Sequence, residues 1–335
     1  MTAKPPSQNV RSNETRDELI SDSLIHAVLD IAVCAGLATL EVYRQSALPV
    51  ADLGETDRPI DHDLKADNSP VTQADIASHQ MISQSLAQLT PSIPVVSEED
   101  EASLKYRQSE GAFWLIDPLD GTKEFIARHG DFTVNIALIV DGISVWGVVF
   151  APALDLLFWG GSGWDGEGGV GFGAGLGTWL GSGPGAWCAE GRARQALSGS
   201  ELVALVKSSP ISVSKPNAVK GAAKYRVVAS KSHMNQATTD FIAALGEVDL
   251  VQAGSSLKIC RIAQGLADVY PRLGPTCEWD TAAAQAVLEG AGGCMYDLQG
   301  QSLRYGKPDV LNPSFVAANM AFSDLPEACR SLHKG

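Results

Sequence analysis

From Ser23 to about Leu89 the hydrophobic and polar positions follow a helical period that one polar stretch interrupts. Apolar residues recur with this period from Ser23 to Arg44, which predicts a long first helix. Leu48 to Asn68 carries many acids and is predicted to be an exposed loop or flap. Ser69 to Asp75 leads into a second predicted helix, which ends near Leu89 because two prolines follow.

Short runs of apolar residues predict strands in the rest of the first half. Asp141-Gly142 separates two of these runs and is a strong signal for a hairpin turn. The predicted strands are Val95–Val96, Phe113–Ile116, Phe132–Val140, Ile143–Phe150 and Leu156–Trp159. The first half is therefore expected to consist of helices packed on an antiparallel sheet.

The second half alternates between strand and helix patterns, which predicts an α/β layer. The predicted strands are Tyr225–Ala229, Val248–Val251, Ala267–Tyr270, Met295–Tyr296 and Ser314–Ala318. The predicted helices are Asn235–Leu245, Leu257–Gly265 and Asp280–Glu289, the last with its C-cap in Gly290–Gly293.

These patterns divide the chain into a tail and two domains. Residues 1–20 are polar and are predicted to be disordered. Residues 21–200 are expected to form an N-terminal α+β domain, and residues 201–335 a C-terminal α/β domain. Residues 160–187 are dense in glycine and tryptophan. They fit either a flexible loop or an extended glycine-rich hairpin, and we interpret them as a tolerated insertion.

Composition narrows the classes of function. The chain has 335 residues, a hydrophobic fraction of 45% and a formal net charge of −14. A sizeable core is therefore expected, whereas non-specific binding to nucleic acid or anionic membranes is disfavoured. The six cysteines show no metal-type or disulfide spacing, which favours a reducing, cytoplasmic compartment. We find no apolar run of transmembrane length and no signal peptide; peripheral association at the inner face of the cell membrane is left open.

Candidate chemistry lies where the run Phe113–Ile116 ends. Asp117 and Asp120 follow it, and Pro118 between them is expected to stop the strand and turn the chain. Gly121 allows another part of the backbone to approach closely. Two carboxylates on a rigid turn beside a helix N-terminus suit a divalent cation together with a phosphate. From this stretch alone, an ordinary turn with an aspartate that caps the helix remains an alternative interpretation.

Other acidic positions occupy similar places at the ends of predicted elements. Glu98-Glu99 follows the run Val95–Val96, Asp280 begins a predicted helix, and Asp75 closes the stretch that enters the second helix. Each acid alone is by default a surface residue or a helix cap. Because they recur together, we predict that they form one site.

With these residues the chain resembles the inositol monophosphatase family of lithium-sensitive, magnesium-dependent phosphatases. The resemblance is carried by Asp-Pro-Leu-Asp-Gly-Thr at Asp117–Thr122, by Glu98-Glu99 upstream and by Trp279-Asp280 downstream, in the family's order. It extends over roughly Ser23 to Asn319, with the glycine-rich segment outside it. It implies a layered αβαβα sugar-phosphatase fold.

The resemblance also implies roles for these residues. The implied ligands of about two to three Mg²⁺ ions are Glu98, Asp117, Asp120, Asp280 and the main-chain carbonyl of Leu119. Asp75 and Thr122 would orient and deprotonate the attacking water, and the backbone N–H groups of Gly121 and Thr122 would hold the phosphate. The C-terminal domain would complete the site through Asp280. Inhibition by Li⁺ is expected as well.

Within this family, several stretches resemble the 3'(2'),5'-bisphosphate nucleotidase branch, the CysQ type. They are Lys65–Thr72, Asp120–Phe125, Ser230–His233, Gly254–Lys258 and Tyr270–Thr276. The implied substrate contacts are Gly121, Thr122, Ser230, His233, Gly254, Lys258, Arg272 and Asp280. Inositol monophosphatases typically have a glutamate at the position of Arg272, whereas an arginine suits a second phosphate. Alternatives without a substrate role remain for three of these residues. Arg272 could belong to a surface turn, Lys258 to a solvated helix face, and His233 could be a capping or core residue.

The implied activity is Mg²⁺-dependent hydrolysis of 3'-phosphoadenosine 5'-phosphate (PAP) to AMP and phosphate. The corresponding phosphosulfate, PAPS, is a candidate second substrate. An inositol or other sugar monophosphatase is the first alternative, and a non-catalytic nucleotide- or metal-binding protein is the second. The expected partner is a small nucleotide bisphosphate and not a nucleic acid, and the protein is expected to be a monomer or a homodimer.

Overall fold

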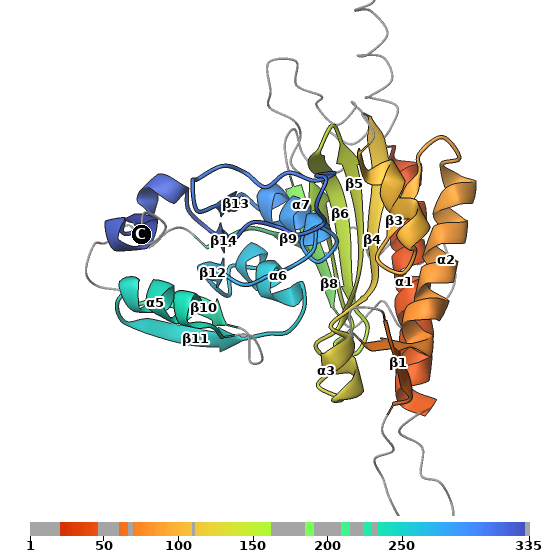
Figure 1. Ribbon diagram of the computed structural model, residues 1–335, viewed down its shortest axis with the longest axis horizontal. Coiled ribbons are helices and arrows are strands. Elements are labelled where there is room, and N and C mark those ends of the chain that lie inside the picture. Colours follow the sequence, from red (N-terminus) through yellow and green to blue (C-terminus); the bar gives the residue numbers. More distant parts are fainter. Residues whose placement is uncertain are drawn as a thin grey trace, which may run out of the picture.

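The computed structural model describes residues 21–45, 60–65, 70–108, 111–161, 185–190, 209–214, 224–229 and 234–331. These residues form layers in the order helices, sheet, helices, sheet, helices, as Figure 1 shows from right to left. The predicted αβαβα fold class is therefore confirmed. The tail 1–20, most of the glycine-rich segment, and Ser230 and His233 lie outside the described residues.

The first helical layer consists of α1 (Asp22–Gln45) and α2 (Gln73–Leu89), which pack on each other and on the large sheet. The apolar stripe of α1 is buried, with Val28, Leu29 and Ala32 inaccessible to solvent. By length and composition Ser23–Gln45 also passes as a membrane span, which the sequence analysis did not expect. Half of the apolar window is buried inside the protein, as in a core helix. Nothing in the described residues supports the peripheral membrane association that the sequence left open.

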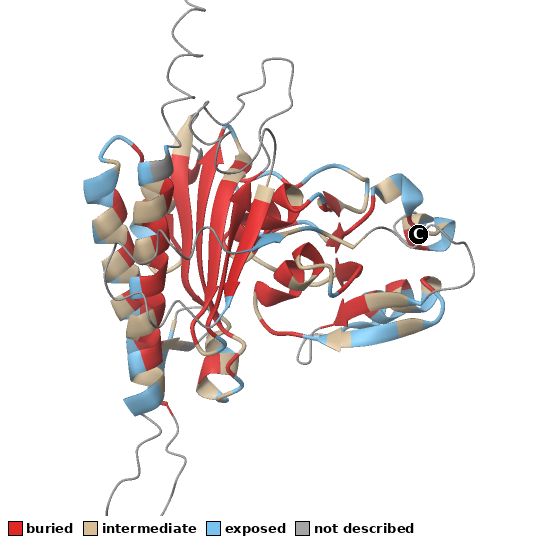
Figure 2. Ribbon diagram, turned by 180° about the vertical axis from the view of Figure 1, so that it is seen from behind, coloured by how far each residue is buried: buried red, intermediate tan, exposed pale blue. Residues whose placement is uncertain are grey.

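The large sheet has seven strands in the order β3-β4-β5-β6-β7-β8-β9. Only β3 and β4 run parallel, and the other neighbours are antiparallel. The strands are β3 (Val95–Ser97), β4 (Ala112–Asp120), β5 (Thr133–Val140), β6 (Ile143–Ala151), β7 (Leu156–Gly161), β8 (Gly185–Glu190) and β9 (Pro210–Ile211). The predicted Asp141-Gly142 turn joins β5 to β6 with positive φ at both residues. Helices cover both faces of this sheet, so its central strands are buried over most of their length (Figure 2).

The expectation that Pro118 ends the strand was wrong. Strand β4 runs on to Asp120, which pairs with Thr133 of β5 after a register shift that begins at Asp117. A bulge tolerates proline because the residues that it contains make no regular ladder bond. The chain therefore bends at Pro118 without leaving the sheet.

Two other segments also differ from the sequence pattern. Strand β1 (His62–Leu64) pairs with β2 (Pro70–Thr72) inside the stretch that was predicted to be a loop. All residues of β1 are exposed, so no hydrophobic pattern marked them. Strand β8, which the sequence pattern did not predict, pairs with β7, Trp159 with Trp187 and Gly161 with Gly185. Residues 162–184, for which a loop and a hairpin were the alternatives, lie outside the described part.

The second half supplies the remaining layers. Its sheet has five strands in the order β11-β10-β12-β14-β13, with β10 parallel to β11 and β12. The strands are β10 (Tyr225–Ala229), β11 (Val248–Gln252), β12 (Val269–Arg272), β13 (Cys294–Asp297) and β14 (Phe315–Ala318). The central helices are α6 (Leu257–Ala263) and α7 (Ala282–Gly290), and the outer elements are α5 (Gln236–Ala244), η3 (Phe322–Asp324) and α8 (Glu327–Ser331). The predicted elements of this half are confirmed to within a few residues.

The two halves meet where α7 packs on the large sheet. Its alanine-rich surface lies against β5, β6 and β7, and a Cβ atom added at Gly147 of β6 would lie 2.5 Å from the carbonyl oxygen of Ala283. This close approach fixes α7, and with it the loop that precedes α7, relative to the strands.

Replacing Gly147 with alanine should therefore destabilise the protein by about 1–3 kcal/mol, because backbone atoms of α7 cannot move aside as a side chain can. Denaturant unfolding measures this loss. The matched control is Gly274→Ala, where the nearest atom would be Asn235 Nδ2 at 3.5 Å, an ordinary contact. Equal stability losses in the two variants would contradict this account of the packing.

Candidate active site

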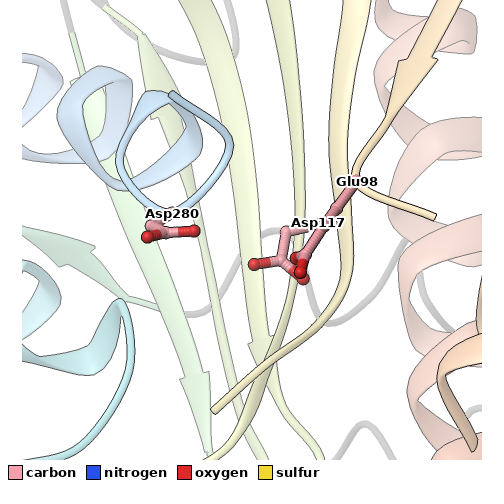
Figure 3. A group of neighbouring side chains, drawn as sticks. All are labelled: Glu98, Asp117 and Asp280. Atoms are coloured by element: carbon pink, nitrogen blue, oxygen red, sulfur yellow. The ribbon is translucent and has the colours of Figure 1, made fainter. Parts of the chain in front are cut away.

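The predicted acidic residues gather where the two halves meet. Because β3 and β4 are parallel, Glu98, which follows β3, lies beside the end of β4 that carries Asp117. Asp280 reaches the same place from the loop before α7 (Figure 3). Carboxylate oxygens of these residues lie within 4.8 Å of one another. We call this group the carboxylate cage.

Asp120 is held beside the cage by the loop before α6. Its Oδ2 atom accepts hydrogen bonds from the backbone N–H of Ser256 at 2.6 Å and from the Ser256 hydroxyl at 2.9 Å. The same hydroxyl lies 2.7 Å from the main-chain oxygen of Asp280, and the Asn135 amide donates to it at 2.9 Å. Ser256 thus ties together two predicted metal ligands. The stretch Gly254–Lys258 had marked this loop, although no role was predicted for Ser256.

Crowding shifts the protonation of these acids. Burial, reinforced by repulsion from Glu98 and Asp120, raises the pKa of Asp117 well above its ordinary value. Burial and repulsion from Asp120 and Glu98 do the same to the pKa of Asp280. Buried carboxylates that repel one another gain from a multivalent cation, and oxygen donors suit a hard ion such as Mg²⁺. The residues present therefore fit the metal that the resemblance implies.

Lys65 partly offsets this negative charge. Its Nζ atom lies 2.8 Å from Glu98 Oε1 and 2.6 Å from Glu99 Oε1. Burial raises the pKa of Glu99 to about 7 despite the hydrogen bond from Lys65. The sequence analysis assigned no role to Lys65, although it opens one of the stretches that carried the resemblance.

Asp75 lies at the start of α2 in a capping box. Its Oδ2 accepts hydrogen bonds from the backbone N–H of Thr72 at 2.8 Å and from the Thr72 hydroxyl at 2.6 Å. Its Oδ1 accepts a hydrogen bond from the Thr122 hydroxyl at 3.2 Å. Burial raises the pKa of Asp75, and these hydrogen bonds oppose the rise. The predicted pair of Asp75 and Thr122 is therefore in contact.

The bulge after Asp117 places the next residues at the mouth of the site. The Leu119 carbonyl lies 3.4 Å from Thr122 Oγ1, a longer distance than that to Asp75. Gly121, just before the short helix α3 (Thr122–Ile126), has φ 91°, and a Cβ atom there would lie 2.2 Å from Ser255 Oγ. Glycine is required at this position for both reasons.

A cleft that is partly open to solvent leads to these residues. Its lining residues are Glu98, Asp120, Gly121, Thr122, Lys123, Glu124, Ser255, Ser256, Lys258, Ile259, Tyr270, Arg272, Thr276, Asp280, Thr281 and Phe315. Two predicted substrate contacts, Lys258 and Arg272, thus share one cleft with Glu98 and Asp280. Gly254 is not in the lining and packs against Asp131 instead.

The two cations have limited freedom. Lys258 is 8% exposed, donates to the Ser255 carbonyl at 3.2 Å, and lies 5.8 Å from the centre of the Tyr270 ring. Arg272 Nη2 donates to the Pro275 carbonyl at 2.8 Å, whereas its Nε makes no hydrogen bond among the described residues. Arg272 Nε is buried, so it is the position of both side chains in the cleft lining that places the two cations beside a ligand there.

Comparison with known proteins identifies the class. The pattern of the inositol monophosphatase family matches residues 38–333, so the chain belongs to that family. The predicted resemblance is confirmed, and so is the prediction that the chain is an enzyme of this phosphatase family.

Its relatives point to one branch. The 3'(2'),5'-bisphosphate nucleotidase CysQ of Salmonella typhimurium (strain LT2) is 39% identical over 295 residues, covering 87% of this chain and 98% of the relative. The protein of the same name from Escherichia coli (strain K12) is also 39% identical over 295 residues, with the same coverage. A crystal structure of CysQ from Bacteroides thetaiotaomicron, a bacterial member of the inositol monophosphatase family, matches with a TM-score of 0.68 and 34% identity over 90% of this chain and 99% of that chain.

Repulsion in the carboxylate cage makes a testable prediction for the metal-free protein. The pKa of Asp117 is raised in the folded state above its unfolded value of about 3.9. Its contribution to stability is therefore present below about pH 4 and is lost as the pH rises through the raised pKa. Asp117→Asn should raise the thermal midpoint at pH 7 in the presence of a chelator, and this gain should vanish near pH 4. The exposed Asp61→Asn is the control, and a variant that is destabilised at pH 7 but not at pH 4 would refute the argument.

Proposed function

We propose that the protein is a Mg²⁺-dependent 3'(2'),5'-bisphosphate nucleotidase. The observation that carries this proposal is that one cleft joins the carboxylate cage to Lys258 and Arg272. A substrate with one phosphate needs only the positive charge that metal ions would supply at the carboxylate cage. A bisphosphate needs a second positively charged site for its other phosphate. The names of the bacterial relatives support the same reading.

The proposed ligands of about two to three Mg²⁺ ions are Glu98, Asp117, Asp120, Asp280 and the Leu119 carbonyl. When bound, Mg²⁺ would neutralise charge on the phosphate oxygens and lower the pKa of the attacking water. The rigid β3–β4 pair and the packed α7 hold these ligands before the substrate arrives. Because Ser256 occupies Oδ2 of Asp120, the Oδ1 atom of that residue is left for the ion.

Thr122 and Asp75 would handle the proton of the water. Thr122 lines the cleft and donates its own hydrogen to Asp75 Oδ1, so its oxygen can accept a hydrogen bond from a water in the cleft. As the water attacks phosphorus, its proton passes to Thr122 Oγ1 while the Thr122 proton passes to Asp75. The Thr72 hydrogen bonds fix the orientation of Asp75 for this transfer.

The substrate would lie along the cleft. The backbone N–H groups of Gly121 and Thr122 would hold the phosphate that is cleaved, and Arg272 and Lys258 the one that stays. Ser230, His233 and Gly254 remain proposed substrate contacts. We propose PAP, cleaved to AMP and phosphate, as the substrate, with PAPS as a second one. A cytoplasmic location and a monomeric or homodimeric state remain our expectation, and the six cysteines, all within the described residues, form no disulfide.

A phosphate-release panel tests the activity. We expect Mg²⁺-dependent hydrolysis of PAP to exceed that of inositol 1-phosphate, and Li⁺ to inhibit because it matches Mg²⁺ in size with half the charge. A preference for inositol 1-phosphate would indicate a sugar monophosphatase. Nucleotide binding without any phosphate release would indicate a binding protein.

Specificity should depend on Arg272. A charge-assisted contact contributes roughly 1.5–3 kcal/mol, about a ten- to hundredfold effect on kcat/KM, and Arg272→Glu should exceed that for PAP. Monophosphate substrates should lose much less, because the cage and Thr122 are unchanged. The measured quantity is the ratio of kcat/KM for PAP to that for a monophosphate. Arg304→Glu, an exposed change of equal charge away from the cleft lining, is the control, and an unchanged ratio in Arg272→Glu would exclude this role.

A further inference from the structure

A second cluster of buried charges lies beside the cage but takes no part in the proposed chemistry. Glu278 is completely buried and Arg107 is 3% exposed, and the two approach each other to 3.8 Å between Arg107 Nε and Glu278 Oε2. Lys307 pairs with the other oxygen of Glu278. We call Arg107, Glu278 and Lys307 the ion triad.

Both oxygens of Glu278 are fully used. Oε2 accepts a hydrogen bond from the backbone N–H of Gly306 at 2.9 Å. Oε1 accepts two hydrogen bonds from Lys307, one from its backbone N–H at 3.1 Å and one from its side-chain Nζ. Arg107 in turn donates through Nη2 to the Pro308 carbonyl at 3.0 Å. A glutamine or a leucine could not reproduce this set of acceptors.

The ion triad joins three segments that are far apart in the sequence. Arg107 belongs to the helical turn η1 (Glu101–Gln108), which follows Glu98 and Glu99. Lys307 lies in the connection between β13 and β14, and the neighbouring Tyr305 N–H donates to the Gly142 carbonyl of the large sheet at 3.0 Å. Glu278 therefore anchors its own loop to the first half of the chain.

That loop carries Asp280. The Glu278 backbone N–H donates a hydrogen bond to the Val310 carbonyl at 2.8 Å. The Glu278 carbonyl accepts one at 3.1 Å from the backbone N–H of Ala282, at the start of α7. Within the loop, Asp280 Oδ2 accepts the Cys277 N–H at 2.9 Å. The position of the Asp280 carboxylate thus depends on how firmly Glu278 is held.

Energetics favour a positioning role over a purely stabilising one. Buried ion pairs contribute little net stability, since losing hydration of the charges costs as much as their attraction returns. The carboxylate cage, by contrast, needs an opposing force, because a carboxylate oxygen of Asp280 lies within 4.8 Å of those of Glu98 and Asp117, and like charges at this distance repel one another when no cation is bound.

We propose that Glu278 is a positioning residue for metal binding: held by Arg107 and Lys307, it keeps Asp280 in the carboxylate cage before the ion arrives. The loop that carries Asp280 is then already ordered in the folded protein, so less conformational entropy is lost when the ion binds. This inference rests on the proposed function, because it requires that the cage binds Mg²⁺.

The test is calorimetric titration of Mg²⁺ into the metal-free full-length protein. Glu278→Gln should bind Mg²⁺ about ten- to a hundredfold more weakly than the wild type, the range found when residues that orient metal ligands are lost. The Mg²⁺ concentration for half-maximal activity should rise in parallel. At saturating Mg²⁺, kcat should return to near the wild-type value, because no group that touches the substrate has changed.

A matched control separates positioning from stability. Asp268 is 3% exposed and forms an ion pair with Arg226 at 2.6 Å, but it does not line the cleft. Asp268→Asn should therefore lower the thermal midpoint as Glu278→Gln does, without changing Mg²⁺ affinity. Lys307→Met, which removes the more exposed cation and leaves Arg107 beside Glu278, is a second test variant in case Glu278→Gln does not fold. It should weaken Mg²⁺ binding in the same direction by a smaller factor.

The outcomes are distinct. Wild-type Mg²⁺ affinity in Glu278→Gln, or in Lys307→Met where the first variant does not fold, would overturn the inference and leave the proposed function standing. Equal weakening in Asp268→Asn would also overturn it, because general destabilisation would then explain the effect. A wild-type protein that binds no Mg²⁺ would overturn the proposed function and this inference with it.

Discussion

Repulsion between buried carboxylates is the constraint on which the rest of this site depends. Asp117 and Asp280 come from different halves of the chain and meet at Glu98, with Asp117 buried and the other two partly exposed in the cleft. Their raised pKa values express how unfavourable that arrangement is without a cation. Lys65 offsets part of the charge, and Ser256 hydrogen-bonds Asp120 nearby. The site is thus built to be completed by positive charge.

The layered architecture supplies the rigidity that such crowding requires. Parallel pairing of β3 and β4 fixes Glu98 beside Asp117, and the close packing of α7 on Gly147 fixes the far side. Asp280 sits on a loop, which is the weakest support of the group. The ion triad around Glu278 ties that loop to η1 and to the connection between β13 and β14.

The cleft brings negative and positive groups together. Its carboxylates lie within residues 38–333, which match the inositol monophosphatase family. Lys258 and Arg272 line the same cleft, and their charges oppose the rise in the pKa of Asp120 and of Asp280, respectively. In the proposed function, the carboxylates serve catalysis and the two cations select the substrate.

Elements and residues whose signals are local could be predicted from the sequence alone. The period of α1 and the Asp141-Gly142 turn need only near neighbours, and the resemblance identified Asp117–Thr122. Tertiary structure decided what depends on distant partners. Strand β4 continues past Pro118 because β5 pairs with Asp120, and Glu278 is buried because segments far along the chain surround it. An acid in a sequence shows its charge, but whether that charge is exposed, paired or gathered with others is set by residues that only folding brings near.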